Sequence, residues 1–106
     1  MEAACRGARQ AGGTTVGILP GLNRSAANPF VDVAVPTGLG EARNALVVRA
    51  ADALVAVGGG YGTLSEVALA LKAGKPVVGL GSWEIEGVEP ATDPAGATEA
   101  ALGRLA

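Results

Sequence analysis

The stretch Gly58-Gly59-Gly60-Tyr61-Gly62 constrains the fold of this chain more than any other segment. It follows the apolar run ALVAV (residues 53–57), which is typical of a strand buried on both faces, and it precedes a helix-forming segment. Successive glycines allow positive φ angles and let a ligand approach the backbone. The N–H groups at a helix start favour an anion, and ligands of open α/β sheets bind beyond the carboxyl ends of strands. The stretch therefore predicts a phosphate-binding loop between a strand and a helix.

The remaining segments predict an α/β fold in which strands and helices alternate. Apolar and β-branched runs bounded by Gly or Pro indicate strands, and Ala-rich or amphipathic segments indicate helices. We expect strands at 14–19, 30–35, 53–57 and 76–80, and helices at 2–11, 41–52, 64–73 and 95–105. Such alternation implies βαβ units and a mainly parallel sheet with flanking helices. The 106 residues suffice for a single domain.

Composition excludes several classes of protein. Hydrophobic residues make up 49% of the chain and charged residues 17%, which excludes a disordered protein. The net charge is −2 and no basic cluster occurs, so we expect no nucleic-acid partner. Because the sequence has no His and one Cys, it excludes His-based metal sites, Ser-His-Asp catalysis and an intrachain disulfide. No apolar run approaches the roughly 20 residues that span a bilayer, and the first residues resemble no signal peptide, so we expect a cytoplasmic protein without a membrane partner.

Two interpretations of Glu66 remain open. The sequence Thr63-Leu64-Ser65-Glu66 fits a capping box, with Thr63 as the N-cap of the helix and Glu66 as its third residue. Alternatively, the Glu66 carboxylate points into a ligand cleft. There it would repel a phosphate but could stabilise an oxocarbenium-like centre on a sugar or orient a water molecule.

Arg43 and Asn44 are further candidates for ligand binding. They follow the break at Gly38-Leu39-Gly40, where another strand is expected to reach its carboxyl end. An arginine at this edge can clamp a phosphate with two hydrogen bonds. The alternative is a solvated arginine paired with Glu41. Asn44 can contact a ligand or cap the helix that it begins.

The two aromatic residues near the expected cleft also have two interpretations each. Tyr61 lies in the loop and can stack on a base or cover the end of the sheet. Trp83 follows the last expected strand, and we expect it to pack against the sheet edge.

The nonapeptide GGGYGTLSE (residues 58–66), with an arginine upstream, resembles the PGG-x-GT-x-x-E motif of the Lonely Guy (LOG) family. The resemblance covers roughly residues 1–80. Members of that family have a Rossmann-like fold, are commonly homodimers, and cleave the N-glycosidic bond of cytokinin riboside 5′-monophosphates or AMP. The resemblance implies that Arg43 and Glu66 form the catalytic pair and that no cofactor is required. It also implies that Gly59, Gly60, Gly62 and Thr63 hold the phosphate. Together with Gly58, Tyr61 and Asn44, they form the ligand-binding set that we expect at the cleft.

Three positions depart from the LOG motif. Gly58 replaces a proline, Asn44 replaces a lysine, and Ser65 replaces an acidic residue of many active members. With Gly-Glu-Ala-Arg-Asn upstream, the sequence is closer to a sibling branch that includes molybdenum cofactor carrier proteins. In that branch, the expected function is to bind a phosphate-bearing cofactor rather than to hydrolyse a nucleotide.

The resemblance also implies that a front portion is missing. Family members begin with a strand, a helix and a second strand that ends in a glycine-rich loop, and Met1-Glu2-Ala3-Ala4 resembles the residues just after that loop. We therefore expect one Rossmann-like domain over residues 1–106 that is incomplete at its N-terminus. Without those strands, we expect the strand at 14–19 to lack a neighbour, and the chain alone to fold poorly or to expose an apolar sheet edge.

Two functions are consistent with this sequence. The first is a nucleoside 5′-monophosphate phosphoribohydrolase, a hydrolase that releases a free base and ribose 5-phosphate. The second is a non-catalytic protein that binds or carries a nucleotide or the molybdenum cofactor. Both take a small nucleotide-like ligand, and a DNA-processing relative is disfavoured by the negative charge.

Overall fold

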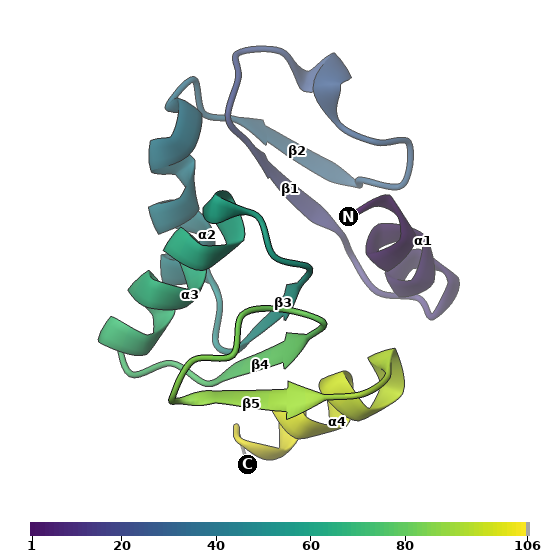
Figure 1. The fold of residues 1–106 in the computed structure, drawn as a ribbon. Coiled ribbons are helices and arrows are strands. Elements are labelled where there is room, and N and C mark those ends of the chain that lie inside the picture. Colours follow the sequence, from purple (N-terminus) through teal and green to yellow (C-terminus); the bar gives the residue numbers. More distant parts are fainter. Residues whose placement is uncertain (106) are drawn as a thin grey trace. The chain divides into compact units, whose positions relative to one another are not determined.

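The structure of the protein, a computed structural model, describes residues 1–105. It divides into two compact units, Met1–Arg43 and a second unit that begins at Asn44. The first unit contains α1 (Glu2–Gln10), β1 (Val16–Leu19), β2 (Val33–Pro36) and two short 3-10 helices at Arg24–Ala26 and Gly40–Ala42 (Figure 1). Helix α2 (Arg43–Ala50) begins at the last residue of that unit. It is followed by β3 (Leu54–Val57), α3 (Tyr61–Lys72), β4 (Val77–Leu80), β5 (Val88–Ala91) and α4 (Pro94–Gly103).

In the first unit, β1 and β2 pair in parallel, with Val16 opposite Val33 and Leu19 opposite Pro36. The expectation that the strand at 14–19 lacks a neighbour is therefore wrong. Strand β2 begins later than the expected residue 30 because a turn occupies Asn28 to Val31. In this turn the Asn28 side chain accepts from the Phe30 N–H at 2.9 Å, and the Asn28 carbonyl accepts from the Val31 N–H at 3.2 Å.

In the second unit, three parallel strands lie in the order β3-β4-β5. The expected α/β class, with parallel strands flanked by helices, is confirmed. Strand β5 was missed in the sequence because Pro90 lacks an N–H group and interrupts the apolar pattern of its segment. The strand tolerates this proline because it is the edge strand of its sheet, where one side of the backbone needs no partner.

Strand β4 forms the centre of the second unit, because its side chains enter a core on each face of the sheet. Val77 packs with Val48 of α2 and with Val67 and Ala70 of α3. Val78, on the opposite face, packs with Ala97 and Ala101 of α4. Helices therefore cover both faces of this sheet, as Figure 1 shows for α3 and α4. This packing fixes the start of α3 at the carboxyl end of β3.

Strand β3 exposes two apolar side chains. This strand is the terminal strand of its sheet, and its Val55 and Val57 side chains are 42% and 66% exposed. Exposed β-branched residues on an unpaired strand edge favour association with other chains. The expectation that the chain alone folds poorly or exposes an apolar sheet edge stays a prediction.

A hydrogen-bonded pair joins the start of β1 to the approach to β2 in the first unit. The Asp32 carboxylate accepts from the Thr15 N–H at 2.8 Å, and the Asp32 N–H donates to the Thr15 hydroxyl at 2.8 Å. Arg9 of α1 lies 3.4 Å from the same carboxylate. The backbone hydrogen bond from Thr15, its hydroxyl and the Arg9 charge together lower the pKa of Asp32 below the ordinary aspartate value of about 3.9.

This lowered pKa predicts that acid destabilises the first unit. A group whose pKa is lower in the folded state stabilises the fold above its unfolded pKa, and that contribution is lost as the pH falls through the folded value. We therefore expect the melting temperature, followed by circular dichroism, to fall as the pH drops below about 4. The Asp32→Asn variant, which cannot titrate at this position, should melt lower at pH 7 and lose this component of the pH dependence. An identical acid profile in both proteins would contradict the assignment.

Candidate functional site

Strand β3, a glycine loop and helix α3 follow one another directly, as the sequence predicts. The strand ends at Val57 and the helix begins at Tyr61. Gly58 has a φ of 76°, a left-handed conformation that favours glycine, and its N–H donates to the Leu80 carbonyl at 3.3 Å. Because this N–H is already paired, Gly58 contributes the turn of the chain rather than a free donor.

Helix α3 begins without a side-chain cap. Gly60 is the N-cap residue, and it makes no side-chain capping hydrogen bond. The first backbone bond of the helix runs from the Leu64 N–H to the Gly60 carbonyl at 3.0 Å. The N–H groups of Tyr61, Gly62 and Thr63 precede this bond and therefore have no acceptor within the helix. These donors, together with the helix dipole, form an end of the helix that favours an anion.

The expected capping box at Thr63 and Glu66 is wrong. The helix begins three residues earlier than that motif requires, because Gly60 takes an extended conformation (φ −75°, ψ 166°) that suits an N-cap. Thr63 is therefore the third residue of the helix, and Glu66 lies in its second turn. Helix capping consequently does not explain Glu66.

The glycine loop leaves open space next to its backbone. A Cβ atom built at Gly58 or at Gly60 would meet no heavy atom within 4 Å, and one at Gly59 would be 3.8 Å from the Trp83 indole nitrogen. Gly59, Gly60 and Gly62 are exposed. A phosphate group can therefore approach the loop without steric conflict with its neighbours.

Asn44 supports the loop from α2. Its side chain is 8% exposed, and its amide donates to the Ser65 hydroxyl at 2.9 Å and to the Gly62 carbonyl at 3.5 Å. The Ser65 hydroxyl donates in turn to the Gly62 carbonyl at 2.8 Å. These bonds turn the Gly62 carbonyl toward α2, and they join two positions at which the sequence departs from the LOG motif. The structure thus gives Asn44 a positioning contact that the sequence did not predict.

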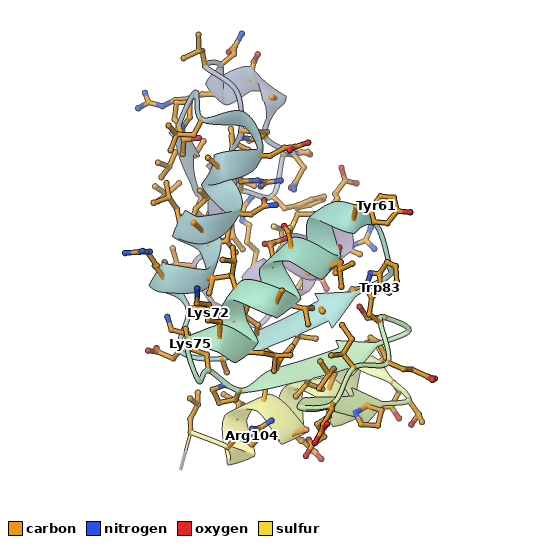
Figure 2. All side chains as sticks on the ribbon, turned by 60° about the vertical axis from the view of Figure 1, so that its left-hand side comes forward. Tyr61, Lys72, Lys75, Trp83 and Arg104 are labelled. Carbon is orange, nitrogen blue, oxygen red and sulfur yellow. The ribbon has the colours of Figure 1, made fainter. Side chains whose placement is uncertain are left out.

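Trp83 and Tyr61 form a stacked pair beside the loop, and Figure 2 shows both rings near the start of α3. The ring centroids are 6.2 Å apart with an interplanar angle of 26°. The Trp83 indole N–H donates to the Gly60 carbonyl at 3.3 Å. From the sequence, Trp83 was expected only to pack against the sheet edge. Its position after β4 could have predicted a place near the glycine loop, because neighbouring parallel strands present their carboxyl ends at the same edge of a sheet.

Arg43 and Glu66, the predicted catalytic pair, occupy different units. Arg43 is the last residue of the first unit, where its guanidinium donates to the Ile18 carbonyl of β1 at 2.7 Å. Glu66 is a half-buried residue of α3 in the second unit. The bond to Ile18 gives Arg43 a structural role at the end of β1.

A pocket of about 340 Å³ lies elsewhere in the second unit. It is lined by β3 and α4, with Val55, Thr98, Ala101 and Leu102 among its residues, and the glycine loop does not line it. The candidate anion site is therefore an exposed loop and not this pocket.

Residues 1–105 contain neither a metal-binding cluster nor a membrane-spanning helix. Over this range no three His, Cys, Asp or Glu side chains are grouped so that they could hold a metal ion. None of the helices in the same range is long and apolar enough to cross a membrane.

The sequence and the fold define a LOG-related class of proteins. Residues 1–101 match the SLOG cluster4 family, and the chain belongs to this family. An uncharacterized protein of Archaeoglobus fulgidus is 50% identical over 80 residues, which are 76% of this chain and 52% of the relative. The chain thus spans about half the length of that relative.

Solved structures of cofactor-binding proteins share the fold. The molybdenum cofactor binding protein of Rippkaea orientalis is 40% identical, with a TM-score of 0.91, over 100% of this chain and 71% of its own. The molybdenum cofactor carrier protein of Chlamydomonas reinhardtii is 43% identical, with a TM-score of 0.82, over 99% of this chain and 70% of its own. The chain therefore has the Rossmann-like α/β fold of these proteins.

Proposed function

We propose that this chain binds a phosphate-bearing small molecule at the glycine loop and that this molecule is the molybdenum cofactor, held without hydrolysis. The observation that carries the proposal is the uncapped start of α3, where open glycines leave backbone N–H groups exposed to a ligand. The likeness to molybdenum cofactor binding and carrier proteins, at 40% and 43% identity, supports this choice of ligand.

In this proposal, the protein supplies binding through its backbone. The N–H groups of Gly59, Gly60, Tyr61, Gly62 and Thr63 donate to phosphate oxygens, and the positive end of the helix dipole faces the anion. The dipole contributes about 0.3–1 kcal/mol at an exposed helix start. Hydrogen bonds to a charged group contribute about 1.5–3 kcal/mol each, so the N–H groups supply most of the affinity. The bound cofactor would bring the molybdenum and its redox chemistry.

The alternative function, a phosphoribohydrolase with Arg43 and Glu66 as its catalytic pair, is less well supported. One guanidinium nitrogen of Arg43 is bonded to the Ile18 carbonyl, which leaves fewer donors for a substrate. Asn44 and Ser65 form a neutral hydrogen-bonded pair where the LOG motif has a lysine and an acidic residue. The pair leaves the second unit without the charges that those residues would bring beside the loop. A homodimer, implied by the LOG resemblance, remains a prediction.

One experiment separates the two functions. The purified full chain is mixed anaerobically with molybdenum cofactor released from a molybdoenzyme, and after gel filtration the protein fraction is assayed for molybdenum and for oxidised pterin fluorescence. In parallel, the chain is incubated with AMP and isopentenyl-AMP, and free base is measured by chromatography. We expect molybdenum and pterin to elute together with the protein and no free base to appear. Base release that is lost in both Glu66→Gln and Arg43→Ala would establish the hydrolase instead. If the chain neither binds the cofactor nor releases base, both functions are refuted.

A further inference from the structure

We propose that a flat nitrogen heterocycle of the ligand stacks on the Tyr61 ring, and that the neighbouring Trp83 ring supports Tyr61 in this role. This inference rests on the proposed phosphate-binding function of the glycine loop. It adds the residue that contacts the planar ring of a phosphate ester, whether this ring is a purine or the pyrimidinone ring of a pterin.

Tyr61 lies next to the backbone N–H groups of the proposed phosphate site. Tyr61 is the first residue of α3, so its ring is attached to the same backbone turn whose N–H groups face the anion. Its side chain is 83% exposed, although aromatic rings usually bury most of their surface. A ligand anchored by its phosphate on this turn would therefore have an aromatic face within reach.

Trp83 contacts both the Tyr61 ring and the glycine loop. Its ring stacks on the Tyr61 ring, and its indole N–H is fixed by the Gly60 carbonyl. The bond to Gly60 fixes the Trp83 ring, and the Tyr61 ring has this fixed indole on one side; Figure 2 shows the two side chains next to each other. A ring that is held in place loses less conformational entropy when a ligand stacks on it. Trp83 is in this sense a positioning residue, and Tyr61 is the contact residue.

Stacking of a base on an aromatic side chain contributes enough to be measured. Alanine substitutions at such contacts cost roughly tenfold or more in affinity, and the contact tolerates different bases because each has a π-face. The proposal therefore predicts preference for any phosphate ester with a planar ring over the same ester without it. GMP and ribose 5-phosphate form such a pair, and guanine shares its pyrimidinone ring with a pterin.

The test titrates the full chain with GMP and with ribose 5-phosphate. Binding is followed by calorimetry and by the fluorescence of Trp83, which is the single tryptophan of the sequence. We expect GMP to bind roughly tenfold more tightly than ribose 5-phosphate and to change the tryptophan emission. In Tyr61→Leu, the affinity for GMP should fall to that for ribose 5-phosphate, whereas Tyr61→Phe should keep the preference.

The outcomes distinguish this inference from the proposed function. If neither compound binds the unaltered chain, the proposed phosphate-binding function fails. If both bind with equal affinity, or if Tyr61→Leu keeps the preference for GMP, stacking is refuted while phosphate binding stands. If Tyr61→Leu weakens both compounds equally, Tyr61 acts on the loop and not on the ring, and the inference is again overturned.

Discussion

Replacing Lys75 with methionine is expected to destabilise the second unit by about 2–3 kcal/mol. The Lys75 ammonium group donates to three carbonyl oxygens at the end of α2, those of Val48 at 2.6 Å, Arg49 at 3.0 Å and Ala51 at 2.7 Å. Carbonyls at a helix end have no partner within the helix, and a positive charge there also interacts favourably with the helix dipole. Methionine keeps the length of the side chain but offers no donor, so all three carbonyls lose the ammonium group, and within residues 1–105 only the Val48 carbonyl keeps another donor, the Ala51 N–H at 3.3 Å.

The matched control is Lys72→Met. Lys72 is an exposed residue in the last turn of α3, and Figure 2 shows it near Lys75. Surface substitutions of this kind usually change stability by less than about 0.5 kcal/mol. Urea unfolding followed by circular dichroism gives both values. A Lys75→Met variant that is as stable as Lys72→Met would contradict the role of Lys75 at the end of α2.

Replacing Gly60 with valine is expected to weaken phosphate binding strongly while leaving the fold intact. Gly60 has a φ of −75°, which any residue adopts, and its Cβ position is open. The added side chain would therefore stand in the space beside the loop without straining the chain. Losing one or two hydrogen bonds to a charged phosphate predicts binding that is weaker by about 10- to 100-fold. Calorimetry with ribose 5-phosphate measures this change.

Two further glycine variants serve as controls. Gly21→Val adds the same side chain in open space outside the loop and should change neither binding nor stability. Gly58→Ala places a side chain at a φ of 76°, so it should cost about 1–2 kcal/mol of folding stability. If Gly60→Val binds phosphate as well as the unaltered chain does, the loop is not the anion site.

Much of the fold could be predicted because local patterns and tertiary packing agree. The apolar runs at 53–57 and 76–80 became β3 and β4. Burial on both faces, which needs apolar side chains throughout, is found in β4, whereas in β3 Val55 and Val57 are exposed. Strand β5 could not be predicted, because a proline inside a four-residue strand is tolerated only at a sheet edge. Edge position is a property of the assembled sheet and not of the segment itself.

Part of the candidate site could also be predicted from local sequence patterns. The glycines between β3 and α3 could be located from sequence, because the chemistry of a tight turn depends on residues that are adjacent in the chain. The first residue of α3 could not be located from the sequence. The capping pattern at Thr63 indicated a later start, but Gly60 takes the extended conformation of an N-cap without offering a side-chain acceptor. Local propensity therefore favoured one boundary, and the packed structure has another.

The sequence by itself determined the α/β class, the position of the glycine loop and the LOG-related character of the motif, because each depends on residues close together in the chain. Only the tertiary structure placed Asn44 on Ser65, Trp83 on Tyr61 and Lys75 on the end of α2. The partners in these contacts are separated by 21, 22 and 24 to 27 residues, and no local pattern records which partner a side chain will meet. Their meeting depends on how α2, α3 and the strands pack, which is decided by the burial of the whole core.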